Sequence, residues 1–193
     1  MNVSVTALPG VLLVEPIVHR DSRGFFLETY QRERYTRAGI EVEFVQDNHS
    51  SSLQGTLRGL HAQLEPGQAK LIRVIEGEIY DVAVDIRRGS PTFGRSVGVR
   101  LSAANQCQLY IPPGFAHGFY VVSPVAQMIY KCSALYRPAG EIAIRWDDPE
   151  IGVPWPIDPE VPVLLSERDK VAPSLRDSWD RLPEMGELGR EGR

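Results

Sequence analysis

Short apolar runs separated by glycine and proline turns constrain the fold of this chain more than any other feature of the sequence. The runs are rich in β-branched and aromatic residues, and in 79–86 apolar and other residues alternate as in a strand. Eight runs are expected to be strands: 11–18, 42–46, 71–75, 79–86, 97–101, 108–111, 118–122 and 125–130. Because helical periodicity is weak throughout, the sequence predicts an all-β antiparallel sandwich or barrel.

Helical structure is expected in only two short segments. Residues 29–38 form a charged helix that stops at Gly39, and residues 177–182 hold one or two turns. A chain of 193 residues buries a sizeable core without disulfides or structural metal. No linker divides it, so we predict one domain over residues 1–176 and a C-terminal tail, 177–193, that is partly disordered.

Charge and composition exclude several classes of protein. The net charge of -4 argues against a nucleic-acid partner. The sequence contains neither a signal-like N-terminus nor an apolar stretch long enough to span a membrane, which predicts a cytoplasmic protein. Cys107 and Cys132 fit neither a metal-binding pair nor a disulfide framework, so both are expected to be reduced thiols.

Two histidines, His61 and His117, lie beside glycines at the edges of expected strands. Imidazole titrates near neutral pH and suits proton abstraction or metal binding, although a hydrogen-bonded structural histidine is the commoner case. A metal site needs further ligands nearby, and Gln63 stands where a second histidine would pair with His61. The residues therefore predict no bound metal.

Lysine, tyrosine and arginine side chains add candidates for chemistry. Lys70 adjoins an expected strand, where an ammonium can stabilise an oxyanion. Tyr130 shares the inward parity of Met128, as a packed aromatic or a proton donor. Arg23 and Arg58 adjoin glycines and offer the planar donors that suit a diphosphate. From the residues alone, a packing or surface role stays open for each of them.

Ten segments occur in a characteristic order: DSRGFFLE (21–28), FVQDNHS (44–50), RGLH (58–61), QAKL (68–71), EGEIYDVAVD (76–85), RRGSPTFG (87–94), IPPGFAHGF (111–119), YKC (130–132), IRWDDP (144–149) and LSERD (165–169). In this order they resemble the dTDP-4-dehydrorhamnose 3,5-epimerase family over about residues 8–176. The resemblance implies a cupin-type jelly roll with a few short helices that works without metal or any other cofactor.

The resemblance also implies catalytic roles for four residues. His61 would be the general base that removes protons from carbons next to the C4 ketone of a nucleotide sugar, with Asp169 bonded to its imidazole. Tyr130 would return a proton from the other face of the sugar ring. Lys70 would stabilise the enolate oxygen at C4.

Nine further residues would bind the substrate, a dTDP-sugar, on the strength of the same resemblance. They are Arg23, Phe26, Glu28, Gln46, Asn48, Arg58, His117, Tyr136 and Glu141. Some would come from a partner subunit, since the resemblance implies a homodimer that exchanges N-terminal strands. The run 10–18 is a plausible exchanging strand, because an unpaired edge favours pairing with another chain.

The expected reaction inverts C3 and C5 of dTDP-4-dehydro-6-deoxy-D-glucose to give dTDP-4-dehydro-L-rhamnose. A mono-epimerase that inverts one carbon fits the same residues. Ala62, where many relatives carry an aromatic residue, and a loop at 64–67 that is one residue shorter than in many relatives both bear on that choice. A non-catalytic sugar-binding cupin has no need of a base and an acid on opposite faces, and a metal-dependent cupin is the third alternative.

Overall fold

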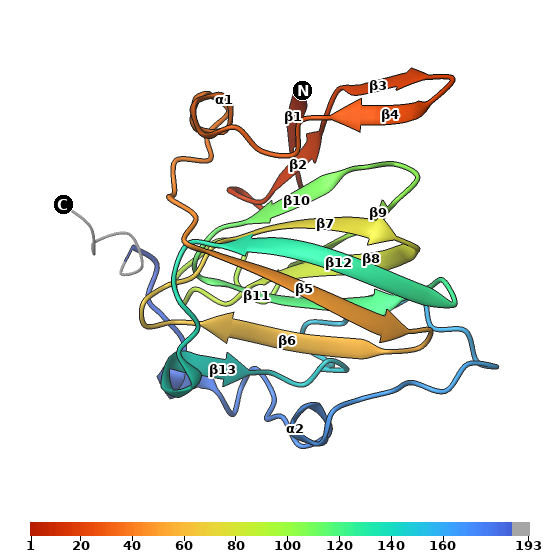
Figure 1. The fold of residues 1–193 in the computed structure, drawn as a ribbon. Helices are drawn as coiled ribbons and strands as arrows, with labels where there is room; N and C mark the ends of the chain where they lie inside the picture. The colour runs from red at the N-terminus through yellow and green to blue at the C-terminus, as the bar shows by residue number, and fades with distance from the viewer. Residues whose placement is uncertain (187–193) are drawn as a thin grey trace.

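Two antiparallel sheets face each other in the computed structural model, which describes residues 1–186 (Figure 1). The first sheet has the order β1 (Asn2–Val5), β2 (Leu12–Glu15), β10 (Gln108–Ile111), β7 (Lys70–Glu76), β12 (Val125–Cys132) and β5 (Gln46–Leu53). The second has the order β13 (Glu141–Ala143), β6 (Leu57–Gln63), β11 (Phe115–Val121), β8 (Glu78–Asp85) and β9 (Ser96–Ser102). This double-sheet architecture confirms the predicted all-β jelly roll.

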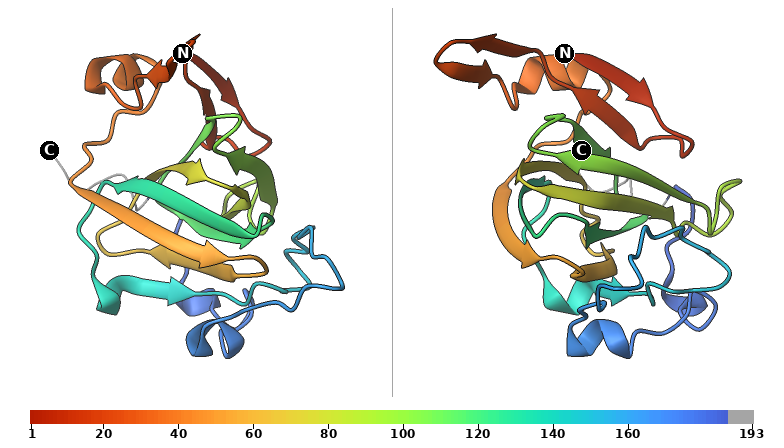
Figure 2. Two further views of the ribbon diagram at one scale, coloured as in Figure 1. Left: turned by 45° about the vertical axis from the view of Figure 1, so that its right-hand side comes forward. Right: turned by 90° about the vertical axis from the view of Figure 1, so that its right-hand side faces the viewer.

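A separate hairpin of β3 (Val18–Asp21) and β4 (Gly24–Leu27) extends from the N-terminal side of the molecule (Figure 2). The expected strand at 11–18 is split, because β2 ends at Glu15 and Pro16 has no N–H to continue the ladder. β2 is paired on both sides within its own chain, with β1 and β10. The part of the run 10–18 that forms β2 is therefore an internal strand, and β1 lies at the edge of the sheet.

The main core lies between the two sheets and fills one end of the sandwich. Its buried members include Leu8, Ile72, Val74, Ile79, Leu109, Phe115, Phe119 and Met128. A second cluster covers the outer face of the first sheet, where Tyr35 of α1 (Arg32–Arg37) packs against Leu71 and Tyr110. The sequence predicts this helix within 29–38. It is shorter because Gln31 caps its start and Gly39, at φ +94°, follows its end.

The C-terminal segment covers the outer face of the second sheet with a third cluster. It includes η1 (Pro138–Gly140), α2 (Glu167–Lys170) and η2 (Trp179–Arg181), the last lying within the predicted 177–182 turns. Leu175 and Leu182 are both 2% exposed and pack in this cluster. The disorder predicted for the tail falls partly on residues 187–193, which lie outside the described residues.

Sequence patterns located the strands from β7 to β12 within a few residues but failed around β5 and β6. The run 42–46 is irregular up to β5, which begins at Gln46, and the sequence pattern predicts no strand at the position of β6. In β5 the sequence QDNHSSSL turns Gln46, Asn48 and Ser52 toward the interior. The usual apolar alternation is absent from this strand because its interior face is polar.

No helix within residues 1–186 has the length and apolar character needed to cross a membrane. Cys107 and Cys132 are both free thiols, as predicted, and Cys132 is buried.

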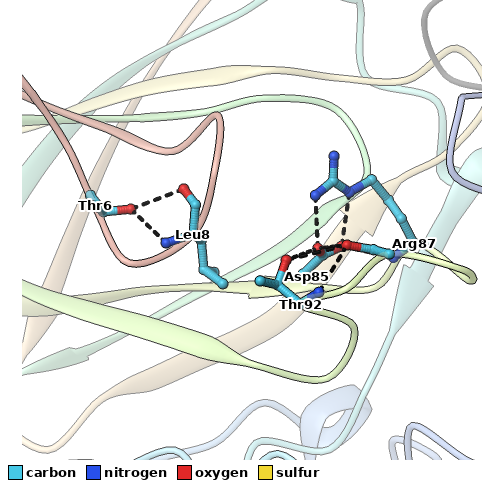
Figure 3. Close-up of polar contacts among 6 residues, drawn as sticks. Thr6, Leu8, Asp85, Arg87 and Thr92 are labelled. Carbon is cyan, nitrogen blue, oxygen red and sulfur yellow. Dashed lines mark hydrogen bonds and ion pairs between the residues drawn. The ribbon is translucent and has the colours of Figure 1, made fainter.

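A buried carboxylate fixes the turn that follows β8. Asp85 accepts hydrogen bonds from Arg87 Nε at 2.8 Å and Nη2 at 2.7 Å, and from the Ser90 and Thr92 hydroxyls at 2.6 Å each. Figure 3 shows Arg87 and Thr92 converging on it. Burial raises the pKa of Asp85, but these hydrogen bonds outweigh burial and hold the pKa below its ordinary value of 3.8.

We expect Asp85→Asn to lower the free energy of unfolding by about 3 kcal/mol at pH 7, because it leaves the largely buried Arg87 without its counter-charge. The lowered pKa makes the carboxylate fully stabilising above pH 3.8, and this stabilisation is lost as the pH falls further. The difference between parent and variant should therefore shrink in acid. Denaturant unfolding from pH 7 to pH 3 measures this.

A matched control is available in Asp147, which accepts from Arg145 in the same two-bond geometry at 2.7 and 2.8 Å. Both side chains of that pair are exposed, so Asp147→Asn should change the unfolding free energy by less than about 1 kcal/mol. Equal losses at the two positions would contradict the role assigned to burial.

Candidate active site

A cavity of about 660 Å³ occupies the end of the sandwich that the main core leaves open. Its lining comes from both sheets and from the segment around α2. The lining residues are Gln46, Asn48, Thr56, Leu57, Arg58, His61, Gln68, Lys70, His117, Phe119, Met128, Tyr130, Tyr136, Glu141, Leu164, Leu165, Ser166, Arg168 and Asp169. All four predicted catalytic residues are in this set, with six of the nine predicted binding residues.

Two strands of the second sheet bring His61 and His117 together, since these residues are cross-strand partners in the β6–β11 pair. The register of this pair then shifts between His117 and Phe119. At the shift Gly59, with φ +125°, lies so close to β11 that an added Cβ would be 2.5 Å from the Gly118 Cα. Only glycine allows this approach, which explains the glycine two residues before His61.

His61 is bonded to Asp169 of α2, 108 residues later in the chain. The His61 Nε2–H donates to Asp169 Oδ1 at 2.6 Å, and the two side chains are 24% and 2% exposed. Burial raises the pKa of Asp169, but the hydrogen bond from His61 and other contacts outweigh burial, so the net shift is downward. An ionised Asp169 on Nε2 leaves Nδ1 as the basic nitrogen of the imidazole.

His117 forms a second histidine–carboxylate pair deeper in the cavity. Its Nε2 lies 3.1 and 3.0 Å from the two carboxylate oxygens of Asp81, which is fully buried. Burial lowers the pKa of His117 more than Asp81 raises it, so the imidazole is neutral near pH 7. A neutral His117 offers an acceptor nitrogen to a bound hydroxyl.

Lys70 and Tyr130 lie on the inner faces of adjacent strands, β7 and β12. Burial lowers the pKa of the Lys70 ammonium, and within residues 1–186 no carboxylate forms an ion pair with it. Burial raises the pKa of the Tyr130 hydroxyl, which keeps the phenol protonated at neutral pH. The cavity thus holds a histidine paired with a carboxylate, a protonated phenol and a lysine side chain that forms no ion pair within residues 1–186.

Tyr136, Glu141 and Arg168 form a polar cluster at the outer end of the cavity. The Tyr136 hydroxyl donates to Glu141 Oε2 at 2.9 Å, and Arg168 forms an ion pair with the same carboxylate. Gln46 accepts from the Tyr136 N–H at 3.0 Å and donates to Asn48 Oδ1 at 3.0 Å. This end can exchange hydrogen bonds with a polar, planar group.

Arg58 lies exposed at the rim of the cavity on β6. Its Nε and Nη2 both donate to the Ser52 hydroxyl, at 3.3 and 3.1 Å. With no carboxylate partner among the described residues, the guanidinium keeps donors for an incoming anion.

The other three predicted binding residues, Arg23, Phe26 and Glu28, do not line the cavity of their own chain. They lie on or next to the β3–β4 hairpin, where Arg23 is paired with Asp21 and Glu28 with Arg34. The Phe26 side chain is 70% exposed. Within one chain the structure separates these residues from the site.

Several lining residues were missed from the sequence, and Arg168 is the most consequential of them. It stands next to Asp169 in the LSERD segment, so adjacency to the carboxylate was the available signal. Gln68 and Ser166 also line the cavity, and both lie inside segments that carry the family resemblance. Within residues 1–186, no three His, Cys, Asp or Glu side chains are grouped so as to hold a metal ion.

Comparisons with known proteins match this chain along nearly its whole length. A family model described as dTDP-4-dehydrorhamnose 3,5-epimerase matches residues 5–177. The dTDP-4-dehydrorhamnose 3,5-epimerase of Pseudomonas aeruginosa is 50% identical over 179 residues, which cover 92% of this chain and 98% of the relative.

Two solved structures are informative about the reaction. The dTDP-6-deoxy-D-glucose-3,5-epimerase of Legionella pneumophila, in complex with dTDP-4-keto-L-rhamnose, has a TM-score of 0.92 and 46% identity, covering 95% of this chain and 98% of that one. A 3'-monoepimerase from Streptomyces bikiniensis, in complex with dTDP-quinovose, has a TM-score of 0.86 and 35% identity, covering 93% and 91%.

Proposed function

The chain belongs to the dTDP-4-dehydrorhamnose 3,5-epimerase family, and from that premise we propose that it inverts C3 and C5 of dTDP-4-dehydro-6-deoxy-D-glucose to give dTDP-4-dehydro-L-rhamnose. The observation that carries the proposal is the His61–Asp169 pair, which opens into the same cavity as Lys70 and Tyr130. The higher identity to the two 3,5-epimerases than to the 3'-monoepimerase favours inversion at both carbons.

His61 is the general base in this mechanism. Its Nδ1 takes the proton from the carbon next to the C4 ketone, and the C–H electrons move to the C4 oxygen as an enolate. Asp169 stabilises the imidazolium that forms and holds the ring in place through Nε2. C3 and C5 both flank C4, so the same ketone acidifies both carbons.

Lys70 and Tyr130 complete the proton transfers. The half-buried Lys70 side chain, which forms no ion pair with a carboxylate within residues 1–186, stabilises the negative charge on the C4 oxygen. Tyr130 then donates its phenolic proton to the opposite face of the carbon, which inverts the centre. Solvent takes the proton from His61 and returns one to Tyr130 before the next inversion.

The binding roles follow the chemistry of the lining. Arg58 contacts the diphosphate or the sugar, and His117 accepts from a sugar hydroxyl. Gln46, Asn48, Tyr136 and Glu141 line the nucleotide end. Arg168 joins them through its ion pair with Glu141.

We further propose that the active form is a homodimer, in which each copy supplies one jelly-roll domain over residues 1–176. The N-terminal element that fits exchange best is the β3–β4 hairpin, since β2 is already paired and Phe25 and Phe26 are 53% and 70% exposed. The partner's hairpin would bring a second copy of Arg23, Phe26 and Glu28 to the cavity. Light scattering at micromolar concentration should give the dimer mass.

A cytoplasmic location stays a prediction.

Proton NMR of the protein with dTDP-4-dehydro-6-deoxy-D-glucose in D₂O tests the reaction directly. We expect deuterium at both C3 and C5 and a rhamnose-configured product after chemical reduction. Exchange and inversion at one carbon only would assign a mono-epimerase. No exchange at either carbon would leave a sugar-binding protein without catalysis.

A further inference from the structure

Gln63 lies on β6 two residues beyond His61, and only 5% of it is exposed. Both the nitrogen and the oxygen of its side-chain amide form hydrogen bonds to backbone atoms of nearby loops. Nε2 donates to the carbonyl oxygens of Pro66 and Leu135, both at 3.1 Å, and Oε1 accepts from the Arg137 N–H at 2.7 Å. The side chain therefore ties two loops together, 64–67 and 135–137.

Two of these bonds bracket Tyr136, because Leu135 and Arg137 are its neighbours in the chain. The N–H of Tyr136 itself donates to Gln46 Oε1 at 3.0 Å. Amide side chains from β5 and β6 thus hold the Tyr136 backbone from two directions. Its ring lines the cavity and its hydroxyl is bonded to Glu141.

Apolar packing contributes little to holding this loop. All residues from 135 to 139 are exposed, and Leu135 is 62% exposed. A second cavity of about 650 Å³ borders the same two loops, with Leu64, Pro66 and Arg137 among its lining. Leu64 packs against the cluster on the outer face of the second sheet, whereas the 135–137 loop has no buried residue, so the position of that loop depends on hydrogen bonds.

We propose that Gln63 is a positioning residue for substrate binding, which acts through Tyr136 on the nucleotide end of the dTDP-sugar. This inference rests on the proposed function, because that function assigns Tyr136 to the nucleotide end. Gln63 does not line the cavity and bonds none of His61, Lys70 or Tyr130. Its loss should therefore weaken binding and leave the proton transfers intact.

Gln63→Met keeps the length of the side chain and removes all three hydrogen bonds. We expect KM for the dTDP-sugar and Kd for dTDP to rise about tenfold, the effect of roughly one mispositioned contact, with kcat within about twofold of the parent. The matched control is Gln106→Met. Gln106 is also buried, donates to the Ala103 carbonyl at 2.7 Å and accepts from Arg73 at 3.2 Å, away from the cavity. It should lower the melting temperature without changing KM.

A double-mutant cycle with Tyr136→Ala separates positioning from a purely structural role. If Gln63 acts through Tyr136, Gln63→Met adds little to KM in the Tyr136→Ala background, whereas effects on thermal stability still accumulate. Independent multiplication of the two KM effects would overturn the proposal. So would an unchanged KM, or a fall in kcat at constant KM, in Gln63→Met.

A second variant and a binding measurement keep the proposal testable. Should Gln63→Met fail to fold, Gln63→Glu retains an acceptor for Arg137 but sets a carboxylate against two carbonyl oxygens, and the same constants are measured on it. Titration with dTDP reports on Gln63 without turnover. A parent protein that binds dTDP but shows no exchange in D₂O would reject the proposed reaction, while the dTDP affinities of the variants would still decide the role of Gln63.

Discussion

His61→Asn should lower kcat for epimerisation by about 10³-fold or more, because it removes the base that takes both protons. A loss of this size corresponds to about 4 kcal/mol of transition-state stabilisation. Asparagine is smaller than histidine and places its amide near the former Nδ1 position, so it removes the base without adding bulk to the cavity. Deuterium exchange at C3 and C5, followed by NMR, measures the loss at each carbon separately.

His49→Asn is the matched control for this experiment. His49 is an exposed histidine on the outward face of β5, bonded to Gln127 at 2.8 Å. The control should exchange both protons at the parent rate. If His61→Asn binds dTDP normally and exchanges at a rate near that of the parent, another residue is the base and the assignment is wrong.

Tyr130→Phe should separate proton exchange from inversion. Without the phenol the enolate has no donor on its second face, so inversion should fall by about 10²-fold or more. His61 can still remove a proton and return one to the same face, so deuterium should continue to enter with retention of configuration. NMR in D₂O reads exchange and configuration in one sample.

Tyr110→Phe removes a buried hydroxyl outside the cavity and serves as the control. Its exchange and inversion should both match the parent. In Tyr130→Phe, exchange and inversion that fall by the same factor would show that Tyr130 assists proton removal and is not the donor to the second face.

The sequence predicts the apolar part of this fold better than the part that carries the site. Strand β10 is predicted at its observed bounds, because all four of its residues are buried and the pattern is unbroken. β5 and β6 are not predicted from the sequence, because their inner faces carry Gln46, Asn48 and His61 where a core strand would carry apolar residues. The polar side chains that make a site possible also remove the signal that locates its strands.

Contacts within the site join residues that are far apart in the sequence, and local sequence patterns do not extend over such separations. No local rule joins His61 to Asp169, so family resemblance alone suggested that contact, which the structure contains at 2.6 Å. The hydrogen bonds of Gln63 on either side of Tyr136 are unpredictable for a related reason. In the sequence Gln63 indicates only that a second histidine is absent, and its three hydrogen bonds depend on how two loops meet.

The long separation between His61 and its carboxylate has a consequence for biosynthesis. A nascent chain exposes β6 well before the ribosome has added the α2 segment, and 108 residues separate the two members of the pair. At typical elongation speeds that interval lasts roughly 5–20 s. During it, the imidazole has no Asp169 to fix its tautomer, so under the proposed mechanism a chain without α2 cannot perform the proton transfer. The proposed activity therefore requires the synthesis of α2, which follows all of the strands from β1 to β13 in the chain.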